Sequence, residues 1–130
     1  MAACVVDASA MLRLLTAQSE AAQVEAALLE ASLVLAPALM LSEVANGLWT
    51  LKRAAVLPAG ADPQDLLRSA TELVDHLEPD HHLQAEALAL ANRLNHSVYD
   101  CLYLALARRE AAALLSFDQR LLALAAQVLP

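Results

Sequence analysis

Four acidic residues lie beside apolar segments of this sequence, where a charged side chain is costly unless a partner offsets it. They are Asp7, Glu43, Asp100 and Asp118. Asp7 and Asp118 each end an apolar run. Glu43 interrupts the longest uncharged stretch, and Asp100 stands at the start of an apolar helical pattern. Four carboxylates gathered in one place need a cation, and oxygen ligands alone are typical of Mg²⁺ or Mn²⁺. The interpretation that explains all four together is a metal site.

The composition is that of a helix-rich chain with a sizeable apolar core. Hydrophobic residues make up 59% of the 130 residues, and there are only two glycines. This length predicts a single domain over residues 1–130. The formal net charge of −7 argues against a simple nucleic-acid-binding module, which normally has a basic face. Low charge and high apolar content favour a protein that associates with itself or with a partner.

Nothing in the sequence predicts export or membrane insertion. The N-terminal apolar run stops at Asp7, too early for a secretion signal. The charge-free stretch 31–42 contains Pro37 and is shorter than the ~18 residues that a membrane-spanning helix needs. We expect Cys4 and Cys101 to be small core residues rather than a disulfide or a metal pair. These features together predict a cytoplasmic protein with no membrane segment.

Alternating strand and helix patterns predict an α/β fold. Short apolar runs indicate strands at 2–6, 33–36, 76–78 and 113–117, with 128–129 as an additional edge strand. Periodicity and start signals indicate a helix beginning at Asp62-Pro63 and others at 9–15, 19–31, 37–55, 82–94, 97–110 and 118–126. Helical crossovers between strands imply parallel pairing. We therefore expect a central, mostly parallel sheet of four to five short strands flanked by helices.

This fold would bring the four acids to one edge of the sheet, because ligands bind at the carboxyl ends of parallel strands. Asp7 and Asp118 end two predicted strands, and Glu43 follows a third. Asp100 lies in the first turn of a helix, where the helix dipole favours a negative charge. A structural alternative is open for three of them. Asp7 and Asp118 could each cap a helix. Asp100 could form a capping box with Ser97.

Four segments of the sequence resemble the PIN-domain ribonucleases, and within that family the toxins of VapBC toxin–antitoxin pairs. The segments are Val-Val-Asp-Ala-Ser-Ala at 5–10, Pro-Ala-Leu-Met-Leu-Ser-Glu-Val-Ala-Asn at 37–46, Ser-Val-Tyr-Asp-Cys-Leu-Tyr-Leu-Ala-Leu-Ala at 97–107 and Leu-Leu-Ser-Phe-Asp-Gln-Arg-Leu at 114–121. They follow the family's order and spacing over nearly the whole chain, and the third is the most specific. Residues 54–69 take no part in the resemblance.

The resemblance implies a PIN-like domain that acts as a Mg²⁺-dependent endoribonuclease and as a VapC-like toxin. By this resemblance the metal ligands and catalytic residues are Asp7, Glu43, Asp100 and Asp118, with Mn²⁺ as an alternative to Mg²⁺. Ser9 and Ser116 are the hydroxyl neighbours of the first and last acids, and Asn46 lies one turn after Glu43. The implied partners are an RNA substrate, a second copy of the chain in a homodimer, and a VapB-like antitoxin. The antitoxin would place a basic side chain near the acids.

The remaining polar and aromatic residues predict no second chemistry. His81-His82 has no further ligand at zinc spacing. His96 is close to Asp100 in the sequence, and we expect it to be a loop residue, with a contact to RNA as the alternative. Five basic residues are candidates for RNA phosphate contacts: Arg13, Lys52, Arg53, Arg93 and Arg120. The aromatic residues Trp49, Tyr99 and Tyr103 are expected in the core or an interface rather than as base-stacking surfaces.

Two functions of other classes stay open at this point. One is a metal-dependent phosphatase or phosphotransfer domain of the doubly wound type, which also gathers acids at strand ends. Such a domain would have an acidic pair near the first strand or a lysine after a late strand, whereas Lys52 lies on a predicted helix. The other is a non-catalytic interaction domain that keeps the acids as helix caps.

Overall fold

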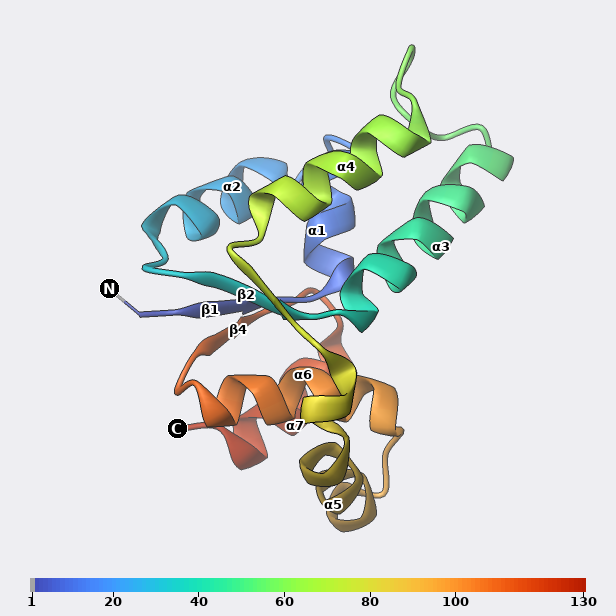
Figure 1. Cartoon of the computed structure of the whole chain (residues 1–130). Coiled ribbons are helices and arrows are strands. Elements are labelled where there is room, and N and C mark those ends of the chain that lie inside the picture. The colour runs from blue at the N-terminus through green and yellow to red at the C-terminus, as the bar shows by residue number, and fades with distance from the viewer. Residues whose placement is uncertain (1) are drawn as a thin grey trace.

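Four short parallel strands form the middle layer of the protein (Figure 1), in a computed structural model that describes residues 2–130. The strands are β1 (Cys4–Val6), β2 (Val34–Pro37), β3 (His76–Glu78) and β4 (Ala113–Leu115), in the spatial order β3-β2-β1-β4. Val5 of β1 lies between Leu35 of β2 and Leu114 of β4. Every residue of β1 and β2 is buried, which explains their continuous rather than alternating apolar pattern.

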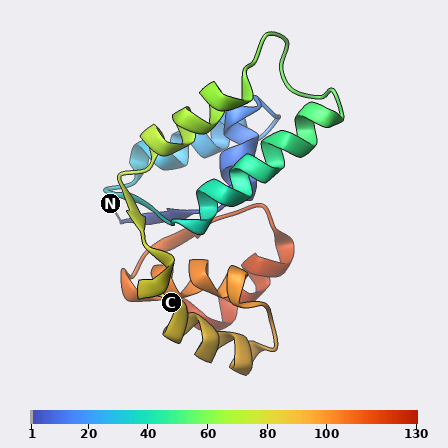
Figure 2. The ribbon, with the colours of Figure 1, turned by 45° about the vertical axis from the view of Figure 1, so that its right-hand side comes forward.

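Seven α-helices within the described residues cover the two faces of this sheet. On one side lie α1 (Ala8–Leu15), α2 (Ala21–Glu30), α3 (Leu39–Arg53) and α4 (Pro63–Leu73), and on the other α5 (Gln84–Leu94), α6 (Val98–Arg109) and α7 (Gln119–Val128), as Figures 1 and 2 show. The central helix of the second layer is α6, which contacts β1, β2 and β4 and is buried throughout residues 101–107. The predicted α/β fold with a parallel sheet is confirmed.

One strand prediction is wrong. Residues 128–129 form no edge strand, because Val128 is the last residue of α7. The N–H of Leu129 still donates to the carbonyl oxygen of Ala125, 2.8 Å away, so the helical hydrogen-bond pattern continues through this segment. The sheet in the described part of the chain therefore has four strands, with β4 at one edge.

Two helix starts also differ from the prediction. Pro37 does not open the long helix: it pairs with Glu78 of β3, and α3 begins two residues later. The helix expected from His82 begins at Gln84 instead. Before it comes a short 3-10 helix, η1 (Asp80–His82), which forms because the N–H of His82 donates to the carbonyl oxygen of Pro79 in a tighter turn.

Other local predictions are confirmed. The carboxylate of Asp62 accepts a hydrogen bond of 3.1 Å from the N–H of Gln64, and Pro63 is the first residue of α4. Cys4 and Cys101 are buried free cysteines. Within residues 2–130, no helix combines the length and the apolar character needed to cross a bilayer.

The carboxyl ends of all four strands point to the same edge of the sheet, since every pairing is parallel. Asp7 follows β1 directly, and α3 starts just after β2. Asp80 lies two residues after β3, and Ser116 follows β4. The topology thus delivers a polar group from each strand to one place, which is where open parallel sheets bind their ligands.

Candidate functional site

Asp7 is the most buried acid of this edge, with 4% of its surface exposed. Its Oδ1 accepts hydrogen bonds from the hydroxyl of Ser9 (2.7 Å) and from the N–H of Ala10 (2.9 Å). Its Oδ2 accepts a hydrogen bond of 2.5 Å from the hydroxyl of Ser116. Burial raises the pKa of Asp7, and these hydrogen bonds oppose that rise, whereas the charge of Asp118 adds to it. Asp7 is therefore fixed in place at both oxygens.

Ser9 and Ser116 tie the start of α1 to the loop after β4. The two hydroxyl oxygens lie 3.4 Å apart. Ser9 Oγ accepts a hydrogen bond from the N–H of Phe117 (2.9 Å), and Ser116 Oγ accepts one from the N–H of Asp118 (3.0 Å). These bonds hold the first and last acids of the site at neighbouring strand ends, in the hydroxyl positions that the sequence analysis assigns to them.

Asp118 is exposed and caps α7. Its Oδ1 accepts hydrogen bonds from the N–H groups of Arg120 (3.0 Å) and Leu121 (3.1 Å). Asp7 caps α1 in the same way, through the N–H of Ala10. The capping interpretation is thus correct for both residues. Ser116 also links them, because its hydroxyl donates to Asp7 and accepts from the N–H of Asp118.

Glu43 projects from the second turn of α3 and is half-buried. The hydroxyl of Tyr103 on α6 donates a hydrogen bond of 2.5 Å to its Oε1, across a separation of 60 residues in the sequence. Burial raises the pKa of Glu43, the Tyr103 hydrogen bond lowers it, and the charges of Asp100, Asp7 and Asp80 raise it further. Glu43 therefore lies within electrostatic reach of two other predicted ligands.

Asp100 occupies the first turn of α6 and pairs with a histidine. Nε2 of His96 lies 2.6 Å from Oδ2 of Asp100, and only 7% of the His96 side chain is exposed. The predicted capping box is wrong, since Ser97 makes no side-chain capping bond. His96 lies in the segment just before the N-cap residue of α6, so this pair fixes the orientation of the Asp100 carboxylate.

A fifth acid at this edge was not predicted. Asp80 in η1 accepts a hydrogen bond of 3.0 Å from the N–H of Leu39, the first residue of α3, and its charge raises the pKa of Glu43. Asp80 thus fixes the start of the helix that carries Glu43. No local signal in the sequence identifies it, because the two residues are 41 positions apart.

The sequence did not predict two further contacts to the acids, those of Tyr103 and His96. Tyr103 is predicted in the core or an interface, and it is buried. Its hydroxyl also donates a hydrogen bond to Glu43. His96 lies in a loop, as predicted, but its contact with the Asp100 carboxylate was not predicted. Asn46 is exposed on α3, and its backbone carbonyl oxygen accepts a hydrogen bond of 3.1 Å from the hydroxyl of Thr50.

The acids retain oxygens that could bind a cation. Among the described residues, the hydrogen bonds to Glu43, Asp100 and Asp118 use one oxygen each, namely Oε1, Oδ2 and Oδ1. Carboxylate oxygens are the ligands that Mg²⁺ prefers. Within residues 2–130, no three His, Cys, Asp or Glu side chains stand close enough together to hold a metal ion.

The model of the PIN domain family matches residues 4–127 of the chain. No curated protein matches the sequence. The family match covers all four strands and every helix described above except the last residue of α7, and it includes all the acids at the carboxyl edge of the sheet.

Proposed function

The chain belongs to the PIN domain family, and from this membership we propose that it is a Mg²⁺-dependent endoribonuclease that acts as the toxin of a toxin–antitoxin pair. PIN domains are typically nucleases and generally use divalent metal ions. The observation that carries the proposal is geometric: the Ser116 hydroxyl contacts both Asp7 and the N–H of Asp118, and Tyr103 joins Glu43 to α6, the helix that carries Asp100.

In the proposed site, Asp7, Glu43, Asp100 and Asp118 would hold the metal through their carboxylate oxygens. The ion, when bound, activates a water molecule, polarises the phosphate and stabilises charge on the leaving oxygen. The surrounding residues would keep the ligands in position. Ser9 and Ser116 fix Asp7, Tyr103 fixes Glu43, and His96 fixes Asp100. Such hydrogen-bond partners orient metal ligands and strengthen them.

The toxin assignment rests on the four sequence segments that resemble VapC-like toxins. It implies two binding partners. One is a second copy of the chain, and the other is a VapB-like antitoxin that covers the acids with a basic side chain. The net charge of −7 is consistent with an inhibitor of opposite charge.

The first test is cleavage of a fluorophore–quencher RNA by the purified chain. We expect cleavage in Mg²⁺ or Mn²⁺, none in EDTA, and recovery when metal is restored. Growth arrest on expression of the chain alone, relieved by co-expression of the small reading frame next to its gene, would support the toxin role. Cleavage that continues in EDTA would contradict the metal-dependent mechanism, whereas a harmless but active protein would contradict only the toxin role.

A further inference from the structure

A surface groove runs from Asp100 along the seam between α5 and α6, the two helices that lie side by side beneath the sheet in Figure 2. Its main hollow has a volume of about 690 Å³ and is lined by Leu88, Asn92, Asn95, His96, Asp100 and Arg120, among others. A second hollow, lined by Gln84, Leu88, Val98 and Tyr99, shares Leu88 and Val98 with the first. We call the two together the α5–α6 groove.

Arg120 supplies the positive charge of the groove. It lies in the first turn of α7, and its N–H donates to Asp118, so it stands directly beside the acids. The side chain is exposed and takes part in none of the ion pairs found among residues 2–130. Arg13, Arg68 and Arg109, by contrast, each pair with a carboxylate. An exposed arginine without such a pair is available to contact a phosphate.

Tyr99 supplies an aromatic face at the other end of the groove. It is 65% exposed, although it directly precedes Asp100 in the chain. From the sequence we expect Tyr99 in the core or an interface and not as a base-stacking surface, but its exposure shows that it is not a core residue. Leu88, beside it in the groove, is 52% exposed. Exposed aromatic rings along a groove that also carries a basic side chain are a usual means of binding unpaired bases.

The polar wall between these ends suits base recognition. Asn92 and Asn95 line the main hollow with side-chain amides that can both donate and accept hydrogen bonds. Asn95 is held in a left-handed conformation, φ 53°, at the end of α5, so the chain turns there into the segment that carries His96. Amides of this kind can read base edges only when the bases are unstacked and unpaired.

We propose that the α5–α6 groove binds single-stranded RNA, with one base stacked on Tyr99 and a neighbouring phosphate on Arg120. The proposal rests on the proposed ribonuclease function and specifies its substrate. Because Tyr99 and Asp100 are adjacent residues, the stacked nucleotide lies next to the phosphate that the acids would act on. A paired strand cannot present its base face to Tyr99, so unpaired RNA is the substrate.

The test measures binding without cleavage. Fluorescence anisotropy in EDTA follows a short labelled oligoadenylate and the same strand annealed to its complement. We expect the single strand to bind better than the duplex. Tyr99→Leu should weaken single-strand binding roughly 5- to 150-fold, the range of one lost base stack, whereas Tyr99→Phe should stay within about 2-fold of the unmodified protein. Arg120→Gln should weaken binding and reduce its salt dependence.

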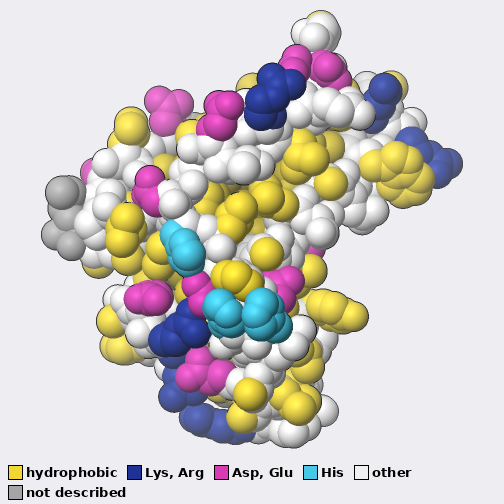
Figure 3. All heavy atoms as spheres, viewed as in Figure 1, with side chains coloured by type: hydrophobic (Ala, Val, Ile, Leu, Met, Phe, Trp, Pro, Cys, Tyr) yellow, Lys and Arg dark blue, Asp and Glu magenta, His cyan; other side chains and the backbone are white. Residues whose placement is uncertain are grey.

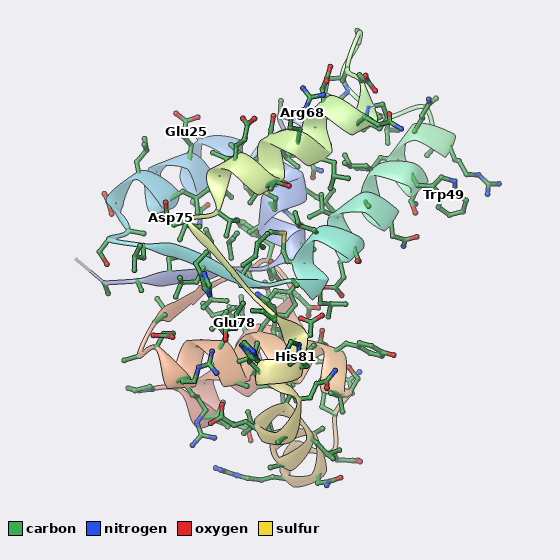
Figure 4. The ribbon with its side chains drawn as sticks, in the orientation of Figure 1. Glu25, Trp49, Arg68, Asp75, Glu78 and His81 are labelled. Atoms are coloured by element: carbon green, nitrogen blue, oxygen red, sulfur yellow. The ribbon has the colours of Figure 1, made fainter. Side chains whose placement is uncertain are left out.

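Trp49 provides a matched control, since it is also an exposed aromatic residue near an arginine. It is 56% exposed, with the Arg53 guanidinium 4.8 Å from its ring centre, and it projects from the far part of α3 in Figure 4. Trp49→Leu should leave RNA binding unchanged. Equal losses in Trp49→Leu and Tyr99→Leu would overturn the proposal, because binding would not depend on the groove.

Three further outcomes separate this inference from the proposed function. Normal binding by Tyr99→Leu, together with metal-dependent cleavage, would overturn the groove and leave the ribonuclease intact. A change in molecular mass of Tyr99→Leu by light scattering, with unchanged RNA affinity, would assign the surface to a protein partner and overturn the RNA proposal. Duplex binding equal to single-strand binding would also overturn it.

Discussion

At the scale of single residues, each predicted metal ligand is held by a specific neighbour. The contact between Tyr103 and Glu43 is the clearest, because it joins two helices on opposite sides of the sheet through one 2.5 Å hydrogen bond. Burial raises the pKa of Tyr103 far above its ordinary value, and the charge of Glu43 raises it further, so the hydroxyl stays protonated and acts only as a donor. Tyr103 is therefore a positioning residue for Glu43.

Tyr103→Phe removes this donor and keeps the ring. We expect RNA cleavage to fall about 10- to 100-fold, the usual effect of removing a group that supports a metal ligand. The Mg²⁺ concentration for half-maximal rate should rise, because Glu43 would be oriented less well. A titration of cleavage rate against Mg²⁺ measures both effects. An unchanged Mg²⁺ dependence, even at a lower rate, would show that Tyr103 has only a packing role.

Glu43 also allows a test of charge repulsion in the metal-free protein. Its folded-state pKa is raised, so ionisation is less favourable in the fold than in the unfolded chain. The resulting penalty is absent well below the ordinary carboxyl pKa and complete once the pH exceeds the folded-state value. Glu43→Gln should therefore raise the melting temperature in EDTA near pH 7 and have less effect near pH 4. A lower melting temperature near pH 7 would show that Glu43 stabilises the fold instead.

At the scale of elements, the acidic edge depends on connections between strands and helices. Glu78, the last residue of β3, belongs to a cluster of charged and histidine side chains. Figure 3 shows histidine, acidic and basic side chains gathered on this face, and Figure 4 labels Glu78 and the neighbouring His81. Its carboxylate contacts His76 (2.7 Å), Arg109 of α6 (2.6 Å) and His82 of η1 (3.0 Å). This cluster fastens β3 and η1 to α6, and Asp80 of η1 in turn caps α3.

These contacts lower the pKa of Glu78 to about 2, first through the hydrogen bond with His76 and then through that with Arg109. The stabilisation is therefore present above the ordinary carboxyl pKa and is lost as the pH falls toward 2. Glu78→Gln should reduce the free energy of unfolding by about 1 kcal/mol near pH 6, since exposed ion pairs contribute little each. Urea unfolding at several pH values measures this loss, which should vanish near pH 2.

A neighbouring acid serves as the control for Glu78. Glu110 lies 3.9 Å from Arg109 and is about half exposed, without the histidine contacts. Glu110→Gln should change stability by only a few tenths of a kcal/mol. Equal effects of the two substitutions would show that the cluster adds nothing beyond one surface ion pair.

The sequence predicted the elements that carry the site, and the reasons are physical. Strand ends such as Asp7 are visible because a buried strand must be continuous and apolar until it leaves the core. The partners of the acids were not visible, because Tyr103 reaches Glu43 across 60 residues. Nor could periodicity separate Tyr99 from Tyr103. All of residues 101–107 are buried, so this part of α6 has no polar face from which the buried side of the helix could be predicted.

At the scale of the whole molecule, the net charge of −7 and the apolar composition bear on its partners. We expect a homodimer, with a mass by light scattering of about twice the 13.8 kDa of one chain. This expectation comes from the resemblance to VapC-like toxins and from the 59% hydrophobic composition of the chain. A mass of one chain at all concentrations would contradict it.

The inhibitor should bind partly through charge and partly through apolar contact. If a basic side chain of the antitoxin lies near the acids, raising the salt concentration should slow association and weaken the complex without abolishing it. Calorimetry at two salt concentrations with the co-expressed partner measures this. Salt-independent affinity would show that the antitoxin binds away from the acidic edge.

If the acids at the carboxyl edge of the sheet cleave RNA with a divalent metal, removing the charge of one ligand should stop cleavage. The most direct measurement is the single-turnover cleavage rate in Mg²⁺ for the unmodified protein, Asp100→Asn and Asp65→Asn, with circular dichroism to confirm folding. Asp65 is an exposed acid on α4 that pairs with Arg68, away from this edge. We predict a loss of more than about 100-fold in Asp100→Asn, beyond the effect of a supporting residue, and an unchanged rate in Asp65→Asn. A folded Asp100→Asn protein that cleaves at the full rate would contradict the account.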